Sequence, residues 1–135
     1  MRRIPVDLKV IIAGSMADRV QGEDILAARP ENTMNLCGKM TILESAWLMK
    51  NAVMNFTNDS APTHVASAVN APVATVFCST VPGFGFTPLS DKSHIIEYPG
   101  KLSCRPCGIH GHRTCPEKHF HCGKKIELSQ LTELI

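Results

Sequence analysis

The stretch Val53-Met54-Asn55-Phe56-Thr57-Asn58-Asp59-Ser60-Ala61-Pro62-Thr63-His64 decides the fold. Its apolar first half predicts a buried strand, and the polar residues at its centre predict that the strand ends there. Asp59 and Ser60 both suit the N-cap of a helix, and Pro62 suits the first helical turn, where a missing N–H group costs nothing. We therefore expect a strand that turns directly into a helix.

A helix that begins at the carboxyl end of a strand is a ready site for an anion. Its free N–H groups and its dipole point at the same spot. His64 lies close to the first turn, near enough to add a donor to a bound phosphate. The alternative is a well-capped helix whose histidine is satisfied locally, and the spacing alone does not decide between the two. Gly14 follows an earlier strand, but a lone glycine without the rest of a dinucleotide fingerprint indicates only a turn.

Apolar runs alternate with helical patterns along most of the chain. The expected strands are 10–13, 34–36, the run from Val53, 73–77 and 93–98, and the expected helices are 18–29, 41–51 and 63–69. Thr41 and Glu44 form a capping box at the start of the second helix. In the first helix, the apolar residues Val20, Ile25, Leu26 and Ala27 are expected on the inner side. Such alternation predicts an α/β fold with a doubly wound parallel sheet covered by helices on both faces.

Ligands of such sheets bind beyond the carboxyl ends of the strands. Three of these ends carry small or polar residues, namely Gly14-Ser15, Asn58-Asp59-Ser60 and Cys78-Ser79-Thr80. No catalytic nucleophile stands out, because no Ser or Cys lies in a recognisable strand-to-helix elbow. The pattern therefore predicts a small α/β domain with an anion-binding turn and leaves its chemistry open.

Composition limits the class of protein. With 135 residues, of which 44% are hydrophobic and 19% charged, the chain suits one globular domain. A formal net charge of +2 is too small to indicate nucleic acid or a membrane surface as a partner. The sequence has no apolar run of the length that spans a bilayer. Arg2 and Arg3 suit the start of a signal peptide, but Asp7 and Lys9 interrupt the apolar run that should follow. We therefore expect a cytoplasmic protein.

The last third of the chain concentrates cysteine and histidine. It contains Cys104, Cys107, Cys115 and Cys122, interleaved with His110, His112, His119 and His121. In a reducing compartment this indicates a metal site or reduced packing thiols rather than disulfides. The first pair has the spacing of zinc sites, and four thiolates would close a tetrahedral structural site. The second pair is spaced more widely, so a folded loop of reduced cysteines stands as the alternative to a structural zinc.

Several segments carry a family resemblance. They are Leu36-Cys37-Gly38-Lys39-Met40-Thr41, the run from Asn58 to Ala68, Pro72-Val73 with Phe77, and the later Cys104-Arg105-Pro106-Cys107, Cys115-Pro116 and His121-Cys122. In order and spacing they resemble glycosyltransferase family nine, the heptosyltransferases of lipopolysaccharide core assembly. The cysteine-bearing segments resemble the tail of that family.

The resemblance implies a GT-B architecture, in which two Rossmann-like domains enclose the active site. This chain would be a partial carboxyl-terminal domain, the half that binds the nucleotide sugar, typically ADP-heptose. Transfer in this family is inverting and needs no metal or other cofactor. By the same resemblance, the backbone N–H groups of Ser60 and Ala61 would hold the diphosphate beside His64, and Asp59 would orient this loop or touch the sugar. The remaining donor contacts would be the backbone of Met40 at the adenine, Asp18 near the ribose, and Ser79 and Thr80 on the sugar side.

The resemblance begins at about the second strand of that domain. We therefore expect a single truncated domain over 1–135, with a Cys/His-rich loop at 102–123. The acceptor domain and its catalytic base would lie outside, so no catalytic residue is assigned here and the isolated chain should be inactive. The lipopolysaccharide core would be bound through the missing domain, at the inner face of the bacterial inner membrane. The alternative is a non-catalytic nucleotide- or zinc-binding module that acts through protein contacts.

Overall fold

A computed structural model describes residues 4–135; the basic pair at 2–3, considered above as the start of a signal peptide, lies outside the described residues. Strands and helices alternate from β1 to β5, and two short helices follow. The elements are β1 (Val10–Ile12), the 3₁₀ turn η1 (Met16–Asp18), α1 (Arg19–Ala28), β2 (Thr33–Asn35), α2 (Ile42–Lys50), β3 (Asn55–Asn58), α3 (Ala61–Ala68), β4 (Val73–Phe77), η2 (Pro82–Phe84), β5 (Ser93–Glu97), α4 (His121–Lys124) and α5 (Ser129–Thr132).

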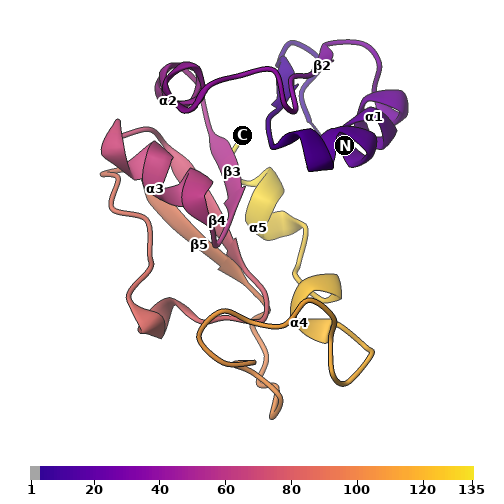
Figure 1. Cartoon of the computed structure of the whole chain (residues 1–135), viewed down its shortest axis with the longest axis vertical. Coiled ribbons are helices and arrows are strands. Elements are labelled where there is room, and N and C mark those ends of the chain that lie inside the picture. Colours follow the sequence, from indigo (N-terminus) through magenta and orange to yellow (C-terminus); the bar gives the residue numbers. More distant parts are fainter. Residues whose placement is uncertain (1–3) are drawn as a thin grey trace.

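Every strand pairing in the described chain is parallel, as the alternation predicted. The strands form two sheets, β1–β2 and β3–β4–β5. In Figure 1 the two-stranded sheet lies on the side of β3 that faces away from β4 and β5. The single sheet that the sequence predicted is therefore divided into two, with the break between β1 and β3. The spacing of apolar residues along the chain does not reveal this break.

The core lies around β4 and α3. Ala66, Ala71 and Val73 are fully buried and pack together, with Met49 and Val69 against them. The central strand β4 is covered on both faces, which explains its continuous apolar and β-branched sequence. This core fixes the position of α3 relative to the carboxyl ends of β3 and β4.

The inner face predicted for α1 is wrong for three of its four residues. Val20, Ile25 and Ala27 are exposed, and only Leu26 is half-buried. The helix instead buries Gly22, where an added Cβ would lie 2.6 Å from Oδ1 of Asn35 on β2. Close approach at a glycine, which apolar periodicity cannot detect, therefore sets the orientation of α1.

The helix α2 begins at the predicted capping box. The Thr41 backbone N–H donates to Oε2 of Glu44 at 2.7 Å, and the Glu44 N–H donates to Oγ1 of Thr41 at 3.3 Å. These bonds lower the pKa of the Glu44 carboxyl, the backbone bond from Thr41 contributing most. The apolar side chains of Ile42, Leu43 and Trp47 on this helix are exposed, the last at 69%.

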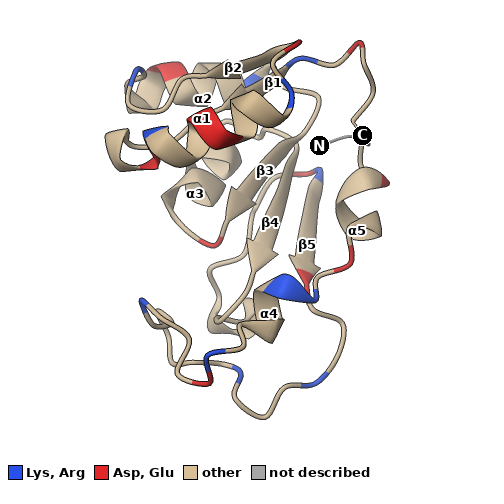
Figure 2. Ribbon diagram, turned by 90° about the vertical axis from the view of Figure 1, so that its right-hand side faces the viewer, with Lys and Arg blue, Asp and Glu red and all other residues tan. Residues whose placement is uncertain are grey.

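The strand predicted from Val53 begins two residues later, and Val53 itself is exposed. No helix of residues 4–135 is long and apolar enough to cross a membrane. Figure 2 shows basic and acidic residues interspersed along the described chain, most of them on helices and loops.

Candidate functional site

Within residues 4–135, the turn from β3 into α3 leaves two backbone donors without an acceptor. Ser60 is the N-cap in an extended conformation, with φ −165° and ψ −175°, and Pro62 lies in the first turn as predicted. A helix start leaves its first N–H groups without helical partners. Here Pro62 carries no N–H, and the N–H of Thr63 donates to the Ser60 carbonyl at 3.0 Å. The N–H groups of Ser60 and Ala61 have no acceptor among the hydrogen bonds of the described residues. They are the pair that the resemblance assigns to the diphosphate.

Three buried threonines hold this turn on the core. The hydroxyl of Thr57 lies 2.9 Å from that of Thr63 and 3.1 Å from that of Thr75, and the last two are 3.1 Å apart. The Thr63 hydroxyl also lies 2.9 Å from the carbonyl oxygen of Asn58, to which it can donate. The end of β3, the start of α3 and the middle of β4 are thus fixed to one another.

Asp59 joins the turn to the end of β4. The Thr80 hydroxyl donates to Oδ2 of Asp59 at 2.5 Å. Two of the three strand ends that the sequence marked as polar are therefore in direct contact. Thr80 is buried, so the groups that contact its backbone hold the residue in place.

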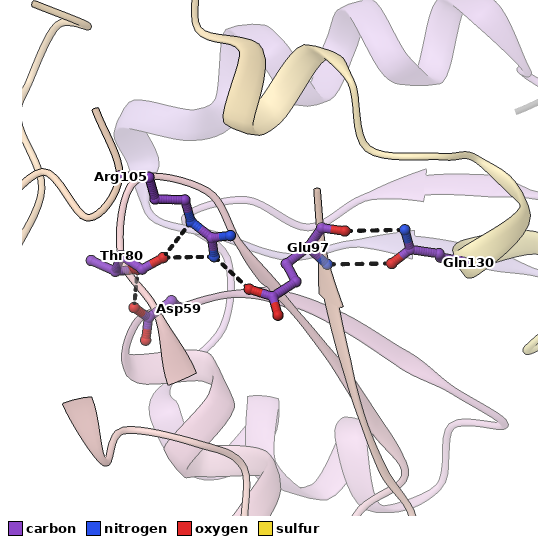
Figure 3. Close-up of polar contacts among 5 residues, drawn as sticks. All are labelled: Asp59, Thr80, Glu97, Arg105 and Gln130. Carbon is purple, nitrogen blue, oxygen red and sulfur yellow. Dashed lines mark hydrogen bonds and ion pairs between the residues drawn. The ribbon is translucent and has the colours of Figure 1, made fainter. Parts of the chain in front are cut away.

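Arg105 braces this contact from the Cys/His-rich loop (Figure 3). Its Nε and Nη2 donate to the carbonyl oxygen of Thr80 at 3.0 and 2.8 Å. Nη2 also pairs with Oε2 of Glu97 at 2.6 Å, the two side chains being 10% and 38% exposed. Glu97 in turn exchanges two backbone hydrogen bonds with the side-chain amide of Gln130 on α5. One guanidinium thus links the end of β4 to the end of β5.

Sequence reasoning gave Arg105 no role. It lies 25 residues from Thr80 along the chain. The one available signal was its position between the paired cysteines Cys104 and Cys107, which the resemblance quoted without a function. No pattern of residue spacing indicates a contact between residues so far apart in the sequence.

The other predicted donor residues lie on separate elements. His64 is exposed, and its ring meets that of Phe86 edge-on with centroids 6.5 Å apart. The carboxylate of Asp18 accepts from the hydroxyl and backbone N–H of Ser15 at 2.6 and 2.8 Å, which lowers the pKa of that carboxyl. Met40 directly precedes the N-cap of α2. No hydrogen bond among the described residues connects Asp18 or Met40 with Asp59, so their assignment stays a prediction.

Ser79 contacts the Cys/His-rich loop through its backbone. Its carbonyl oxygen accepts from the N–H of Cys107 at 2.8 Å. An added Cβ at Gly111 would also clash with the Ser79 hydroxyl, so the loop lies tightly against this strand end. Whether Ser79 lines the sugar side is a prediction that this contact does not test.

The four clustered cysteines line one cavity of about 330 Å³, together with His112, Glu117 and His119. Burial raises the pKa of the Cys107 thiol, and the thiols of Cys104, Cys122 and Cys115 raise it further. Within residues 4–135, however, no three such side chains are arranged to hold a metal ion. The donor set fits zinc in its chemistry, but its arrangement does not form a ready site. A structural zinc therefore stays a prediction.

The cavity and the turn are different places. None of the residues that line the cavity belongs to 58–64, and Arg105 is the one residue that both lines the cavity and braces Thr80. The Cys/His-rich loop therefore supports the strand ends through Arg105 and Cys107.

The sequence model of glycosyltransferase family 9 (heptosyltransferase) matches residues 6–121. The chain belongs to this family. The lipooligosaccharide heptosyltransferase 2 of Haemophilus influenzae is 40% identical over 91 residues, which are 64% of this chain and 26% of that protein. The lipopolysaccharide heptosyltransferase 2 of Escherichia coli is 33% identical over 92 residues, 65% of this chain and 26% of that protein. The chain thus spans about a quarter of the length of these relatives.

Solved structures agree with the family. The ADP-heptose lipopolysaccharide heptosyltransferase II of E. coli matches 93% of this chain and 36% of its own, with a TM-score of 0.64 and 25% identity. The family 9 glycosyltransferase of Veillonella parvula matches 90% of this chain and 32% of its own, with a TM-score of 0.63; at 19% identity it shows the fold alone.

Membership in family 9 confirms the predicted family and the Rossmann-like α/β class of a partial GT-B domain. It also favours the transferase over the alternative of a non-catalytic module. The single truncated domain over 1–135 and the individual donor contacts stay predictions. So does the absence of a cofactor.

Proposed function

We propose that this chain is the donor-binding part of an inverting heptosyltransferase that moves heptose from ADP-heptose to the lipopolysaccharide core. The observation that carries the proposal is the pair of free N–H groups at Ser60 and Ala61, in a chain that belongs to family 9. Free N–H groups at a helix start are suited to a diphosphate, because they donate directly and share the positive end of the helix dipole.

The neighbouring residues support this role. The exposed imidazole of His64 lies on the same turn and can add a further donor to phosphate. Asp59 is held by Thr80, and Thr80 by Arg105, so the loop is fixed before the ligand arrives. A preformed loop avoids the entropic cost of ordering on binding. Asp59 thereby orients the loop, while Ser79 and Thr80 face the sugar and the Met40 backbone and Asp18 face the nucleoside.

The proposal assigns binding and orientation to this chain, and the proton transfer to another part of the enzyme. Inverting transfer needs a base that takes the proton from the acceptor hydroxyl as the anomeric carbon is attacked. The lipopolysaccharide core would be bound by that other part, at the inner face of the bacterial inner membrane.

Calorimetry with the folded 135-residue chain tests the proposal. We expect ADP to bind more tightly than AMP, because only ADP places a second phosphate at the helix start. His64→Ala should weaken ADP binding more than AMP binding. A folded chain, checked by circular dichroism, that binds neither nucleotide would contradict the proposed role, and so would equal affinities for the two.

A further inference from the structure

The residues that follow β5 carry an excess of positive charge. Residues 101–125 (the basic segment) contain six of the 14 Lys and Arg residues of the chain and only one of its 12 Asp and Glu residues. The net charge of the basic segment is therefore +5, whereas the rest of the chain has a net charge of −3. The small total of +2 conceals a strong separation of charge along the chain.

Most of these cations face solvent. Arg105 is the exception, because it is paired with Glu97 and with the carbonyl of Thr80. The other five are exposed, and their side chains form no hydrogen bond or ion pair within residues 4–135; they are Lys101, Arg113, Lys118, Lys124 and Lys125. The charges of such side chains add to a positive potential over the surface that they share.

The basic segment lies at the carboxyl ends of the strands. The N–H of Cys107 donates to the Ser79 carbonyl and Arg105 donates to the Thr80 carbonyl, so the segment contacts the residues that follow β4. Figure 2 shows the arrowheads of β4 and β5 pointing toward α4 and the loops around it, where the blue of Lys and Arg outweighs the red of Asp and Glu. The positive potential is therefore centred at this end of the sheet.

The turn proposed to hold the diphosphate lies at the same end. It follows the carboxyl end of β3, and its Asp59 accepts a hydrogen bond from Thr80. Of the carboxylates at these strand ends, that of Glu97 is neutralised by Arg105. A surface of one sign raises the local concentration of a ligand of opposite charge and can raise its association rate by roughly 10- to 1000-fold.

We propose that the basic segment is an electrostatic collecting surface for the donor. Its exposed cations attract the anionic nucleoside diphosphate to the carboxyl ends of the strands and speed its arrival at the start of α3. Holding the diphosphate is a separate task, which falls to the N–H groups of Ser60 and Ala61. The identity of the ligand rests on the proposed function. Charges at the rim of a binding site act chiefly on the association rate, so the dissociation rate should not depend on this surface.

Stopped-flow binding of a fluorescent N-methylanthraniloyl derivative of ADP to the 135-residue chain measures both rates. Lys124→Glu/Lys125→Glu changes the net charge of the basic segment from +5 to +1. Lys9→Glu/Lys92→Glu is the matched control, because these lysines are also exposed and directly precede β1 and β5, at the amino ends of the strands. Lys124→Ala/Lys125→Ala is a milder change at the tested positions. Circular dichroism checks that each variant is folded.

At about 0.1 M salt, exposed charges act over about 10 Å. Lys124→Glu/Lys125→Glu should then lower the association rate constant roughly tenfold, with the alanine pair in between and the dissociation rate constant unchanged. The control should change the association rate constant less than about twofold. At about 1 M salt the variants should converge on the parent, because the charges are screened. An equal association rate in the charge-reversed variant and the parent at the lower salt would overturn the proposal, and so would an equal loss in the control.

The potential of the basic segment can also be measured without nucleotide. An anionic gadolinium chelate, compared with a neutral one, should enhance the relaxation of amide protons more at 110–125 than around Lys92, and the excess should shrink in Lys124→Glu/Lys125→Glu. Without such an excess the proposal falls, whether or not the chain binds ADP. An excess in a folded chain that binds no ADP would instead contradict the donor role and, with it, the ligand named for this surface.

A bilayer is the other large anion that a basic surface could meet. Sedimentation with phosphatidylglycerol vesicles compares the parent with the charge-reversed variant. If the reversal removes vesicle binding and leaves the association rate of the ADP derivative unchanged, the surface serves a membrane and the proposal is overturned.

Discussion

Arg105→Met removes the guanidinium that links the ends of β4 and β5 and keeps an aliphatic side chain of similar length. The Thr80 carbonyl loses both of its side-chain donors, at 3.0 and 2.8 Å, and the Glu97 carboxylate loses its partner at 2.6 Å. The substitution therefore tests whether the Cys/His-rich loop stabilises the strand ends through this residue.

The cost follows from the burial of each partner. Thr80 is buried, and an unsatisfied buried acceptor costs about 1–3 kcal/mol. Glu97 is 38% exposed, so loss of its ion pair adds at most about 1 kcal/mol. We expect the free energy of unfolding to fall by about 2–3 kcal/mol. For a domain of this size that lowers the thermal midpoint by roughly 6–10 °C.

Thermal unfolding followed by circular dichroism measures this effect. Arg113→Met is the matched control, because Arg113 lies on the same loop and is exposed; it should stay close to the parent. Arg105→Lys should fall between the two, since an ammonium keeps the charge but not the planar pair of donors. If Arg105→Met and Arg113→Met unfold at the same temperature, the brace does not exist.

Three further results are expected. Thr75→Val should destabilise the domain by about 1–2 kcal/mol in urea unfolding, because it breaks the threonine cluster. Thr33→Val is the control and should be neutral or stabilising, because its buried hydroxyl has no partner among the described residues. Equal losses of stability in the two variants would contradict this expectation. Glu44→Gln should destabilise the domain at pH 7, and the difference in the free energy of unfolding should shrink as the pH falls below the ordinary pKa of a glutamate. The reason is that the pKa of this carboxyl is lowered in the folded state, so the stability that it contributes is lost as the pH falls through the folded-state pKa; a difference that does not shrink with falling pH would refute it. If the four thiols bind zinc, elemental analysis should find one metal per chain and Cys104→Ser should release it, while metal-free protein would remove zinc from the account.

Local signals predicted the elements that local bonds make. Thr41 and Glu44 predicted the start of α2, because a capping box is formed within four neighbouring residues. Pro62 after the N-cap candidates Asp59 and Ser60 predicted the start of α3 in the same way. Alternation of these elements was enough to predict parallel pairing, since short connections leave few other topologies.

Features that depend on distant residues were not predictable. The orientation of α1 follows from the contact of Gly22 with Asn35. The spacing of apolar residues gives no weight to a glycine, so it could not predict this contact. The brace at Arg105 depends on Thr80 and Glu97. The residue pattern correctly placed the turn at 58–64 between a strand and a helix, but it did not show what holds that turn in place.

We propose that the free N–H groups at the start of α3 hold the diphosphate of the donor. Ala61→Pro tests it directly, because proline fits the first position of a helix and the preceding Ser60 is extended, as a residue before proline prefers. The substitution removes one donor without a cost to the fold. Calorimetry should show ADP affinity reduced about tenfold or more, as expected for one charge-assisted hydrogen bond, with the thermal midpoint unchanged. ADP binding that is equally tight in Ala61→Pro and the parent chain would contradict the account.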